Sequence, residues 1–169
     1  MAYTHLIPLI SRLAGHHILV VGDVILDEYL IGRADRLSRE APIPVLEFER
    51  RDLIPGGAAN PSANVASFGS QAIQVGVVGQ DASADALRDM LRAQGIDPGG
   101  LISDPSRPTT TKTRIMAHMG LRFPQQVARI DRIDRKPING GVEQAVLDRL
   151  HTLASHVDAI MVSDYLTGL

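Results

Sequence analysis

The sequence predicts an α/β fold, with a doubly wound parallel sheet and a smaller β excursion. The continuous apolar run at residues 18–21 and the largely apolar runs at 72–79 and 158–162 are typical of strands that are buried on both faces of a parallel sheet. Helical patterns lie between these runs, so the chain contains at least two β-α-β units. Such units have right-handed crossovers, and their repetition gives a doubly wound sheet.

Composition narrows the class of protein. A chain of 169 residues with a hydrophobic fraction of 44% can form one domain with a real core. Its net charge of −2 and aromatic fraction of 4% give no case for binding nucleic acid or a membrane surface. The absence of cysteine excludes disulfides and thiolate metal sites, and we expect a cytoplasmic protein. The histidines lack the spacing of metal ligands, so no protein metal site is expected.

The first predicted strand ends beside two carboxylates. A short helix is predicted over residues 1–14, and the strand at 18–21 follows it. Asp23 comes shortly after this strand, and Asp27 lies four residues further on. Because ligands of open α/β sheets bind outside the carboxyl ends of the strands, both carboxylates are candidates for binding hydroxyl groups. The alternatives are that Asp23 caps a turn and that Asp27 is solvated.

Two segments are predicted to form β structure outside the main sheet. Residues 31–54 are interrupted by prolines and alternate at strand period, which indicates an exposed excursion, either a lid or a dimer surface. The β-prone residues of the segment 109–132 flank a turn at 120–124, so they are expected to pair as a hairpin. Arg129 and Asp131 share one face of this hairpin by the period-two rule.

A glycine-rich loop that begins at Pro55 leads into a helix, and Gly69 is predicted to end that helix. Gly56 and Gly57 permit positive φ and let a ligand approach the backbone closely. Asn60 is the predicted N-cap, because the proline after it suits the first helical position. A helix N-terminus facing a glycine loop favours oxygen-rich or anionic ligands, although an ordinary loop-to-helix turn has the same pattern.

Two further helices complete the β-α-β units. Asp81 is expected to cap the first of them, and Gly95 to end it. Asn139 or Gly140 opens the second, which leads to the strand at 158–162. The polar cluster that follows this strand includes Asp164, which is a structural cap more often than a ligand contact.

Several motifs together carry a resemblance to a known family. The chain resembles the ribokinase-like sugar kinases, or PfkB family, and within it the heptose 7-phosphate kinases of lipopolysaccharide-core synthesis. The glycine motif is specific for the family, whereas segments 36–45 and 125–131 indicate the heptose branch. The similar segments cover nearly the whole chain and are residues 21–29, 36–45, 55–60, 76–81, 111–114, 125–131 and 163–165.

The resemblance implies a sugar kinase and assigns it a sugar site. The γ-phosphoryl group of ATP, which brings Mg²⁺ with it, would be transferred to the anomeric hydroxyl of a heptose 7-phosphate. Asp27 would accept hydrogen bonds from sugar hydroxyls, and Asp23 is a further candidate. Gly56, Gly57 and Asn60 would hold the sugar through backbone and amide groups.

Basic residues of the predicted hairpin are candidates for the substrate phosphate. Arg129 would contact it, because a guanidinium matches phosphate oxygens bidentately, unless Arg129 forms an ion pair with Asp131. Lys112 and Arg114 would add positive charge there, or else lie on a solvated face of the hairpin. We expect a sugar phosphate as the small-molecule partner and a homodimer through the lid segments.

The chain departs from the family pattern in three ways. Pro61 and Ser62 stand where relatives usually have an apolar residue and alanine, and Thr167 stands where they usually have lysine. The Gly-Ala-Gly-Asp motif, whose aspartate is the family's catalytic base, has no counterpart, and neither do the ATP-binding strands. We therefore expect the N-terminal half of a ribokinase-like domain, with no catalytic residue and negligible kinase activity on its own.

Two alternatives to this function stay open. The chain is either part of such a kinase or a non-catalytic sugar-binding or interaction module that has the first half of the fold. If it is a kinase, fructose phosphate, ribose or a nucleoside are the other candidate substrates, although the basic hairpin favours a phosphorylated sugar.

Overall fold

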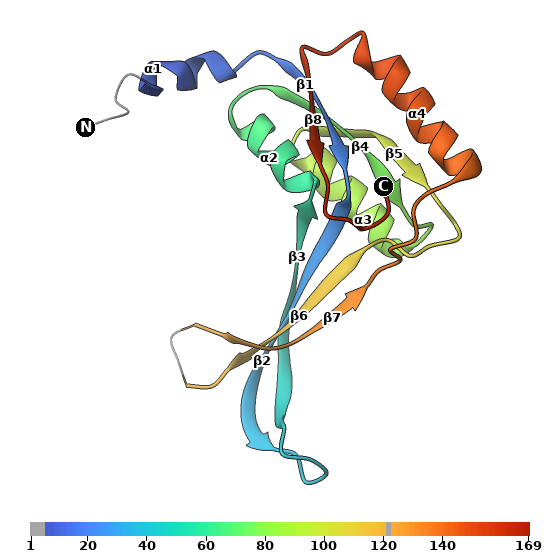
Figure 1. Ribbon diagram of the computed structural model, residues 1–169. Helices are drawn as coiled ribbons and strands as arrows, with labels where there is room; N and C mark the ends of the chain where they lie inside the picture. The colour runs from blue at the N-terminus through green and yellow to red at the C-terminus, as the bar shows by residue number, and fades with distance from the viewer. Residues whose placement is uncertain (1–5, 121–122) are drawn as a thin grey trace.

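The computed structural model describes residues 6–120 and 123–169. Two four-stranded sheets form its framework, and Figure 1 shows the second sheet extending away from the helices that surround the first. The first sheet is parallel, with the strand order β5-β4-β1-β8. Its strands are β1 (His17–Gly22), β4 (Gln71–Val78), β5 (Ile96–Ser103) and β8 (Ala159–Ser163).

Helices cover both faces of the first sheet, which confirms the predicted doubly wound arrangement (Figure 1). On one face, α2 (Ala59–Ser67) and α3 (Ala82–Ala93) contribute to a core that includes Leu87 and Leu91. On the other face, α4 (Gly140–Ala154) packs through Val146 against residues of β1 and β4. Burial from both sides explains why these two strands are almost continuously apolar.

The predicted limits of α3 and α4 agree with the structure. Asp81 is the N-cap of α3, and its carboxylate accepts a hydrogen bond from the backbone N–H of Ala84 at 3.0 Å. Gly95 follows the end of α3 with a φ of 74°, in the left-handed region that glycine adopts without strain. Asn139 is the N-cap of α4, as expected, although its side chain makes no capping hydrogen bond.

The second sheet has the strand order β3-β2-β6-β7 and joins the two β segments that the sequence predicts separately. β2 (Val24–Leu37) and β3 (Pro44–Gly57) form a long antiparallel hairpin, which extends beyond the predicted 31–54 at both ends. β6 (Thr111–His118) pairs with β2 in parallel, and β7 (Gln125–Arg132) closes the expected hairpin. Within the predicted turn, residues 121–122 lie outside the described residues.

The glycine motif is not a loop, and this changes the start of α2. Gly56 and Gly57 are the last residues of β3 and pair with β2. The next N–H group, from Ala58, donates to the backbone oxygen of Asp23 at 2.9 Å, and Ala58 becomes the N-cap of α2. The prediction of Asn60 as N-cap is therefore wrong. The predicted stop is confirmed, because Gly69 follows the helix with a φ of 82°.

The N-terminal segment is less regular than predicted. It contains a four-residue helix, α1 (Ile7–Ile10), and a 3-10 turn, η2 (Ser11–Leu13), while residues 1–5 of the expected helix lie outside the described residues. The apolar side chains of Leu6 and Ile10 are exposed there. Among the helices of residues 6–120 and 123–169, none is long and apolar enough to span a membrane.

The edge strand β8 presents apolar side chains to solvent. Ile160, Met161 and Val162 are 50%, 41% and 73% exposed. Ile160 and Met161 border a groove of about 460 Å³ whose other walls come from α2, β1 and the N-terminal segment. An exposed parallel strand with apolar side chains is a surface on which further chain or a partner can pack.

Candidate functional site

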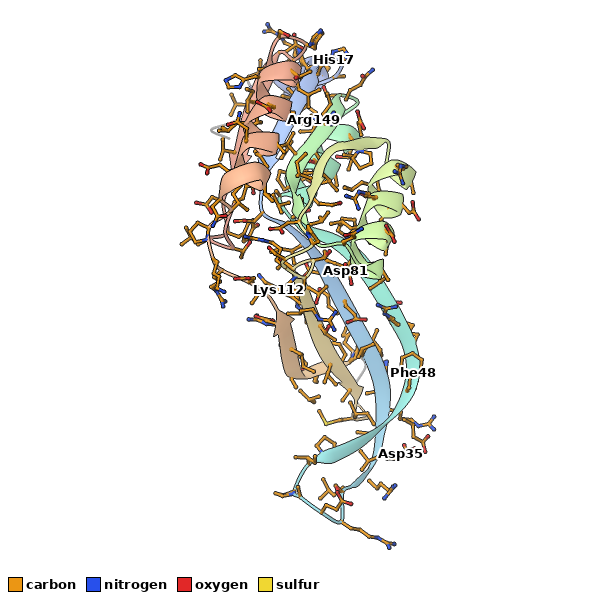
Figure 2. The ribbon with its side chains drawn as sticks, turned by 90° about the vertical axis from the view of Figure 1, so that its right-hand side faces the viewer. His17, Asp35, Phe48, Asp81, Lys112 and Arg149 are labelled. Atoms are coloured by element: carbon orange, nitrogen blue, oxygen red, sulfur yellow. The ribbon has the colours of Figure 1, made fainter. Side chains whose placement is uncertain are left out.

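Charged and aromatic side chains gather on one face of the second sheet, close to the first sheet. Strand register brings them together, because residues directly opposed across neighbouring strands share a face. Figure 2 shows Lys112, one member of this group, near the junction of the two sheets. The six residues are Asp27, Lys112 and Asp131 in one row across β2, β6 and β7, and Tyr29, Arg114 and Arg129 in the next.

Asp27 is held by an arginine from the neighbouring strand. Its Oδ1 accepts a hydrogen bond from Nη1 of Arg114 at 2.6 Å, and each of these two side chains is 21% exposed. The hydrogen bond to Asp27 is the main reason why the pKa of Arg114 is raised. The guanidinium also lies over the ring of Tyr29, 5.2 Å from its centroid. Asp27 is therefore not a freely solvated carboxylate, and its orientation is fixed.

The two glycines of the motif are required by close contacts with the start of β2. A Cβ on Gly56 would lie 2.9 Å from Cγ of Asp27 and closer still to Oδ2. A Cβ on Gly57 would lie 2.9 Å from a side-chain carbon of Ile25, and its φ of 58° favours glycine. The absence of side chains at these positions lets the Asp27 carboxylate lie directly against the backbone of β3.

Lys112 has no carboxylate partner among the ion pairs of the described residues. Its Nζ lies 5.8 Å from the ring centroid of Tyr165, which follows β8. A cation–π contact at an exposed site is weak, about 0.5–1 kcal/mol. Asp27 and Asp131 are its neighbours in the same row, but neither forms an ion pair with the ammonium group.

Arg129 pairs with Asp131, which is the alternative that the sequence leaves open. Both terminal groups meet bidentately, with Nε–Oδ1 and Nη2–Oδ2 distances of 2.8 and 2.9 Å. The pair is on the outer strand β7, with the Arg129 side chain 48% exposed. The guanidinium fork that would fit a phosphate is therefore occupied by a carboxylate of the same strand.

The other predicted site residues lie in different environments. Asn60 is exposed in the first turn of α2, near the end of the glycine motif. Asp164 accepts a hydrogen bond from the backbone N–H of Leu166 at 2.7 Å, as a local turn. Asp164 is therefore a structural cap, the more common of the two roles that the sequence allows.

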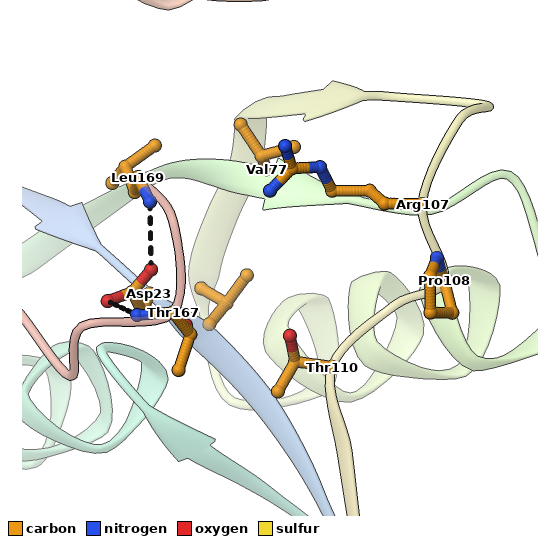
Figure 3. Close-up of a pocket in the computed structure, with 8 residues that line it drawn as sticks. Asp23, Val77, Arg107, Pro108, Thr110, Thr167 and Leu169 are labelled. Carbon is orange, nitrogen blue, oxygen red and sulfur yellow. Dashed lines mark hydrogen bonds between the residues drawn. The ribbon is translucent and has the colours of Figure 1, made fainter. Parts of the chain in front are cut away.

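Asp23 organises the segment that follows β8 (Figure 3). Asp23 is only 5% exposed. Its carboxylate accepts hydrogen bonds from the backbone N–H groups of Tyr165, Thr167 and Leu169, at 2.8, 3.2 and 3.2 Å. Burial alone would raise the pKa of Asp23, but these hydrogen bonds, with that of the Thr167 hydroxyl, lower it. The carboxylate therefore binds backbone N–H groups of the protein itself, as expected if Asp23 caps a turn rather than binding a ligand.

Ser62, which stands where relatives usually have alanine, belongs to a buried polar pair. Ser62 and Gln74 are both fully buried, and the serine hydroxyl donates to Oε1 of the glutamine at 2.6 Å. The amide of Gln74 donates in turn to the backbone oxygens of Val20 and Val75. The pair links α2 to β4. Sequence reasoning missed it, because neither residue type predicts its partner.

Sequence reasoning also missed the aromatic residues of the site. Tyr29 and Tyr165 lie under the two cations Arg114 and Lys112, which come from β6. The alternation of Lys112 and Arg114 along β6 places both on one face, but only the pairing with β2 reveals their neighbours. Within residues 6–120 and 123–169, no group of three His, Asp or Glu side chains could hold a metal ion.

Comparison with known proteins identifies the family. The model of the pfkB family of carbohydrate kinases matches residues 16–122, which is more than half of the chain and includes both the glycine motif and Arg114. The chain belongs to this family. The match covers β1 to β6, which are three strands of each sheet of this pfkB-family chain, whereas β7 and β8 lie beyond the matched residues.

Curated relatives of this pfkB-family chain are longer than it is. The bifunctional protein HldE of Trichlorobacter lovleyi is 42% identical over 151 residues, which cover 89% of this chain and 30% of that protein. The chain thus spans about a third of the length of the curated relatives it matches.

Solved structures share its fold. A structure described as a possible 1-phosphofructokinase from Thermotoga maritima has a TM-score of 0.62 at 18% identity, over 87% of this chain and 44% of that one. An Arabidopsis thaliana ribokinase, complexed with ribose and ATP, has a TM-score of 0.56 at 17% identity, over 80% of this chain and 43% of that one. These likenesses confirm the predicted ribokinase-like α/β fold.

Proposed function

We propose that this chain carries the sugar-phosphate site of an ATP-dependent sugar kinase whose substrate is a heptose 7-phosphate. Membership of the pfkB family supports a carbohydrate kinase, and the HldE relatives favour the heptose substrate. The observation that carries the proposal is the juxtaposition of Asp27, Gly56 and Lys112. It combines an oriented hydroxyl acceptor, a glycine backbone against which that acceptor lies, and a cation without an ion-pair partner among the described residues.

The sugar ring would lie over the glycine end of β3. A hydroxyl of the sugar donates to Oδ2 of Asp27, and glycine at positions 56 and 57 leaves room for the Asp27 carboxylate and the start of β2 to lie against β3. The exposed amide of Asn60, at the start of α2, reaches other hydroxyl groups from the helix. Holding the sugar in one orientation lowers the entropic barrier to phosphoryl transfer.

Lys112 is a better candidate than Arg129 for the substrate phosphate. A phosphate at Lys112 replaces a weak contact with the Tyr165 ring, whereas a phosphate at Arg129 competes with the bidentate carboxylate of Asp131. Asp23 contributes by fixing the segment after β8, which carries Tyr165, rather than by touching sugar.

Chemistry at the anomeric hydroxyl needs groups that we do not assign to this chain. When bound, ATP with Mg²⁺ supplies the phosphoryl group. No catalytic base is assigned, since the sequence lacks the Gly-Ala-Gly-Asp motif, and no metal ligand is assigned among residues 6–120 and 123–169. The residues of the site bind and orient the sugar, and in the cytoplasm, where we place the protein, both substrates would meet there.

Binding can be measured by tyrosine emission. The chain has no tryptophan, and two of its three tyrosines lie under the site's cations. Titration with D-glycero-D-manno-heptose 7-phosphate is expected to change the emission and saturate, with weaker binding of fructose 6-phosphate and ribose. Lys112→Met is expected to weaken heptose 7-phosphate about tenfold, the equivalent of ~1.4 kcal/mol. No saturable binding by the wild-type chain would refute the proposal, and equal affinity for all three sugars would refute the heptose assignment.

The second sheet is also our proposed homodimer surface. Phe48 and Ile130 are 68% and 59% exposed on it, and Leu37, at the end of β2, is 67% exposed. Burying such side chains against a second copy would remove apolar area from water. Phe48→Asp should convert a dimer into a monomer in sedimentation experiments. A wild-type chain that sediments as a monomer at all concentrations would refute this surface.

A further inference from the structure

The two oxygens of Asp27 lie in different environments. Oδ1 is bonded to Arg114 at 2.6 Å. Oδ2 lies against the Cα side of Gly56, where any Cβ would overlap it. The carboxylate is therefore held from both sides, by an arginine on β6 and by the backbone of β3, and it cannot rotate without losing one of these contacts.

Arg114 is itself held in place toward Asp27. Its guanidinium stacks over Tyr29, which is two residues after Asp27 on β2. The next arginine across the sheet, Arg129, is occupied by Asp131 and does not compete for the Asp27 carboxylate. The planar guanidinium makes both the stacking contact and the ionic hydrogen bond, a combination that lysine cannot reproduce.

We infer that Arg114 is a positioning residue that fixes Asp27 so that Oδ2, over Gly56, is the oxygen that receives the sugar hydroxyl. This inference rests on the proposed function and specifies how the sugar is selected. A hydrogen bond to a fixed carboxylate oxygen depends on the orientation of the hydroxyl, so the site distinguishes a sugar phosphate from a phosphate ester without hydroxyls.

The test compares two probes on the 169-residue chain: D-glycero-D-manno-heptose 7-phosphate and n-propyl phosphate, which carries a phosphate but no hydroxyl. Arg114→Lys is expected to weaken the heptose phosphate about tenfold, because the hydrogen bond to an oriented carboxylate is lost, and to change propyl phosphate by less than about twofold. Gly56→Ala, which keeps every charge but displaces the carboxylate, is expected to have the same selective effect. The ratio of the two affinities is the readout, since a general loss of structure would lower both.

Arg50→Lys is the matched control. Arg50 pairs with Asp52 at 3.0 Å on the adjacent strand β3, away from Gly56, and its replacement should leave both affinities unchanged. Unchanged heptose affinity in both Arg114→Lys and Gly56→Ala would overturn the inference while leaving the proposed function intact. Equal losses for both probes in Arg114→Lys would also overturn it, because the effect of Arg114 would then not be selective for the probe that carries hydroxyl groups. A wild-type chain that binds propyl phosphate but gains nothing from the sugar would overturn the proposed function and the inference with it.

Discussion

Replacing Asp23 by asparagine separates a structural role from a sugar contact at this position. The change keeps the shape of the side chain but removes its charge and converts one oxygen into an NH₂ group. Oδ2 accepts the N–H groups of Tyr165 and Thr167, and Oδ1 accepts that of Leu169. An asparagine oxygen in the Oδ2 position keeps two of these three bonds in neutral form, and its NH₂ group then faces the N–H of Leu169.

The magnitude follows from these contacts. Hydrogen bonds to a charged group contribute about 1.5–3 kcal/mol each, whereas neutral ones contribute about 1 kcal/mol. In Asp23→Asn, one of the three backbone hydrogen bonds is lost and two are weakened, at a position that is only 5% exposed. We therefore expect Asp23→Asn to lower the free energy of unfolding by about 3 kcal/mol, and the melting temperature by roughly 6–12 °C for a chain of this size.

The pH dependence provides an internal control. The folded-state pKa of Asp23 is held below its ordinary value of 3.8. At pH values between the folded-state and unfolded-state pKa, the native state therefore binds fewer protons than the unfolded state. The stabilisation by Asp23 is then complete above about pH 5 and is lost as the pH falls through the lowered pKa. The difference between wild type and variant should accordingly shrink toward pH 3. Other carboxylates with lowered pKa values, such as Glu28 and Asp104, occur in both proteins and cancel in the comparison.

Urea denaturation followed by far-UV circular dichroism, at several pH values, measures these free energies. Sugar-phosphate affinity is then measured on folded Asp23→Asn protein, and it is expected to fall by less than about twofold. A variant as stable as wild type at pH 7 would refute the structural role. A stable variant that has lost sugar binding would instead make Asp23 a direct contact.

Two other predictions concern the buried pair and the charged face. Ser62→Ala leaves Oε1 of Gln74 buried without its donor, so it should cost about 1–3 kcal/mol in urea denaturation, and an unchanged midpoint would contradict the pairing. Asp131→Asn frees the Arg129 guanidinium and removes a negative charge beside Lys112. Because exposed ion pairs contribute ~0.2–1 kcal/mol, n-propyl phosphate should bind this variant a few-fold more tightly, as measured by tyrosine emission. Weaker binding in that variant would show that Asp131 orients the phosphate contact.

The sequence predicts the first sheet well because its signals are local. The strands β1, β4 and β8 are recognisable from apolar runs, and Asp81 and Gly95 mark the ends of α3. The prediction that all three are buried is wrong for β8, which is an exposed edge strand because no further strand or helix covers it among the described residues. Each of these signals depends on the conformation of a few neighbouring residues. Periodicity likewise indicates the β6-β7 hairpin and the shared face of Arg129 and Asp131, which depend on chain neighbours alone.

The site could be predicted only in part, because its contacts join strands that are far apart in the chain. Asp27 and Arg114 are separated by 87 positions and meet only through the parallel pairing of β2 with β6. A different long-range pairing, that of β2 with β3, explains the wrong N-cap. A glycine pair before a helix predicts a loop, but pairing with β2 extends β3 to Gly57, and the helix therefore starts earlier.

That continuation of β3 determines how the site is built. Had the chain left the sheet at Pro55, the glycines would have formed a flexible loop, and Asp27 would have faced solvent. Because β2 and β3 remain paired to Gly57, the Asp27 carboxylate lies against glycine backbone, and the same strand β2 presents it to Arg114 on its other side. A short side chain on a paired strand, between a glycine and an arginine, has one orientation available. The selectivity of the proposed sugar site then depends on the hairpin pairing as much as on the identity of Asp27, which is why Gly56→Ala should affect sugar binding although it alters no charged group.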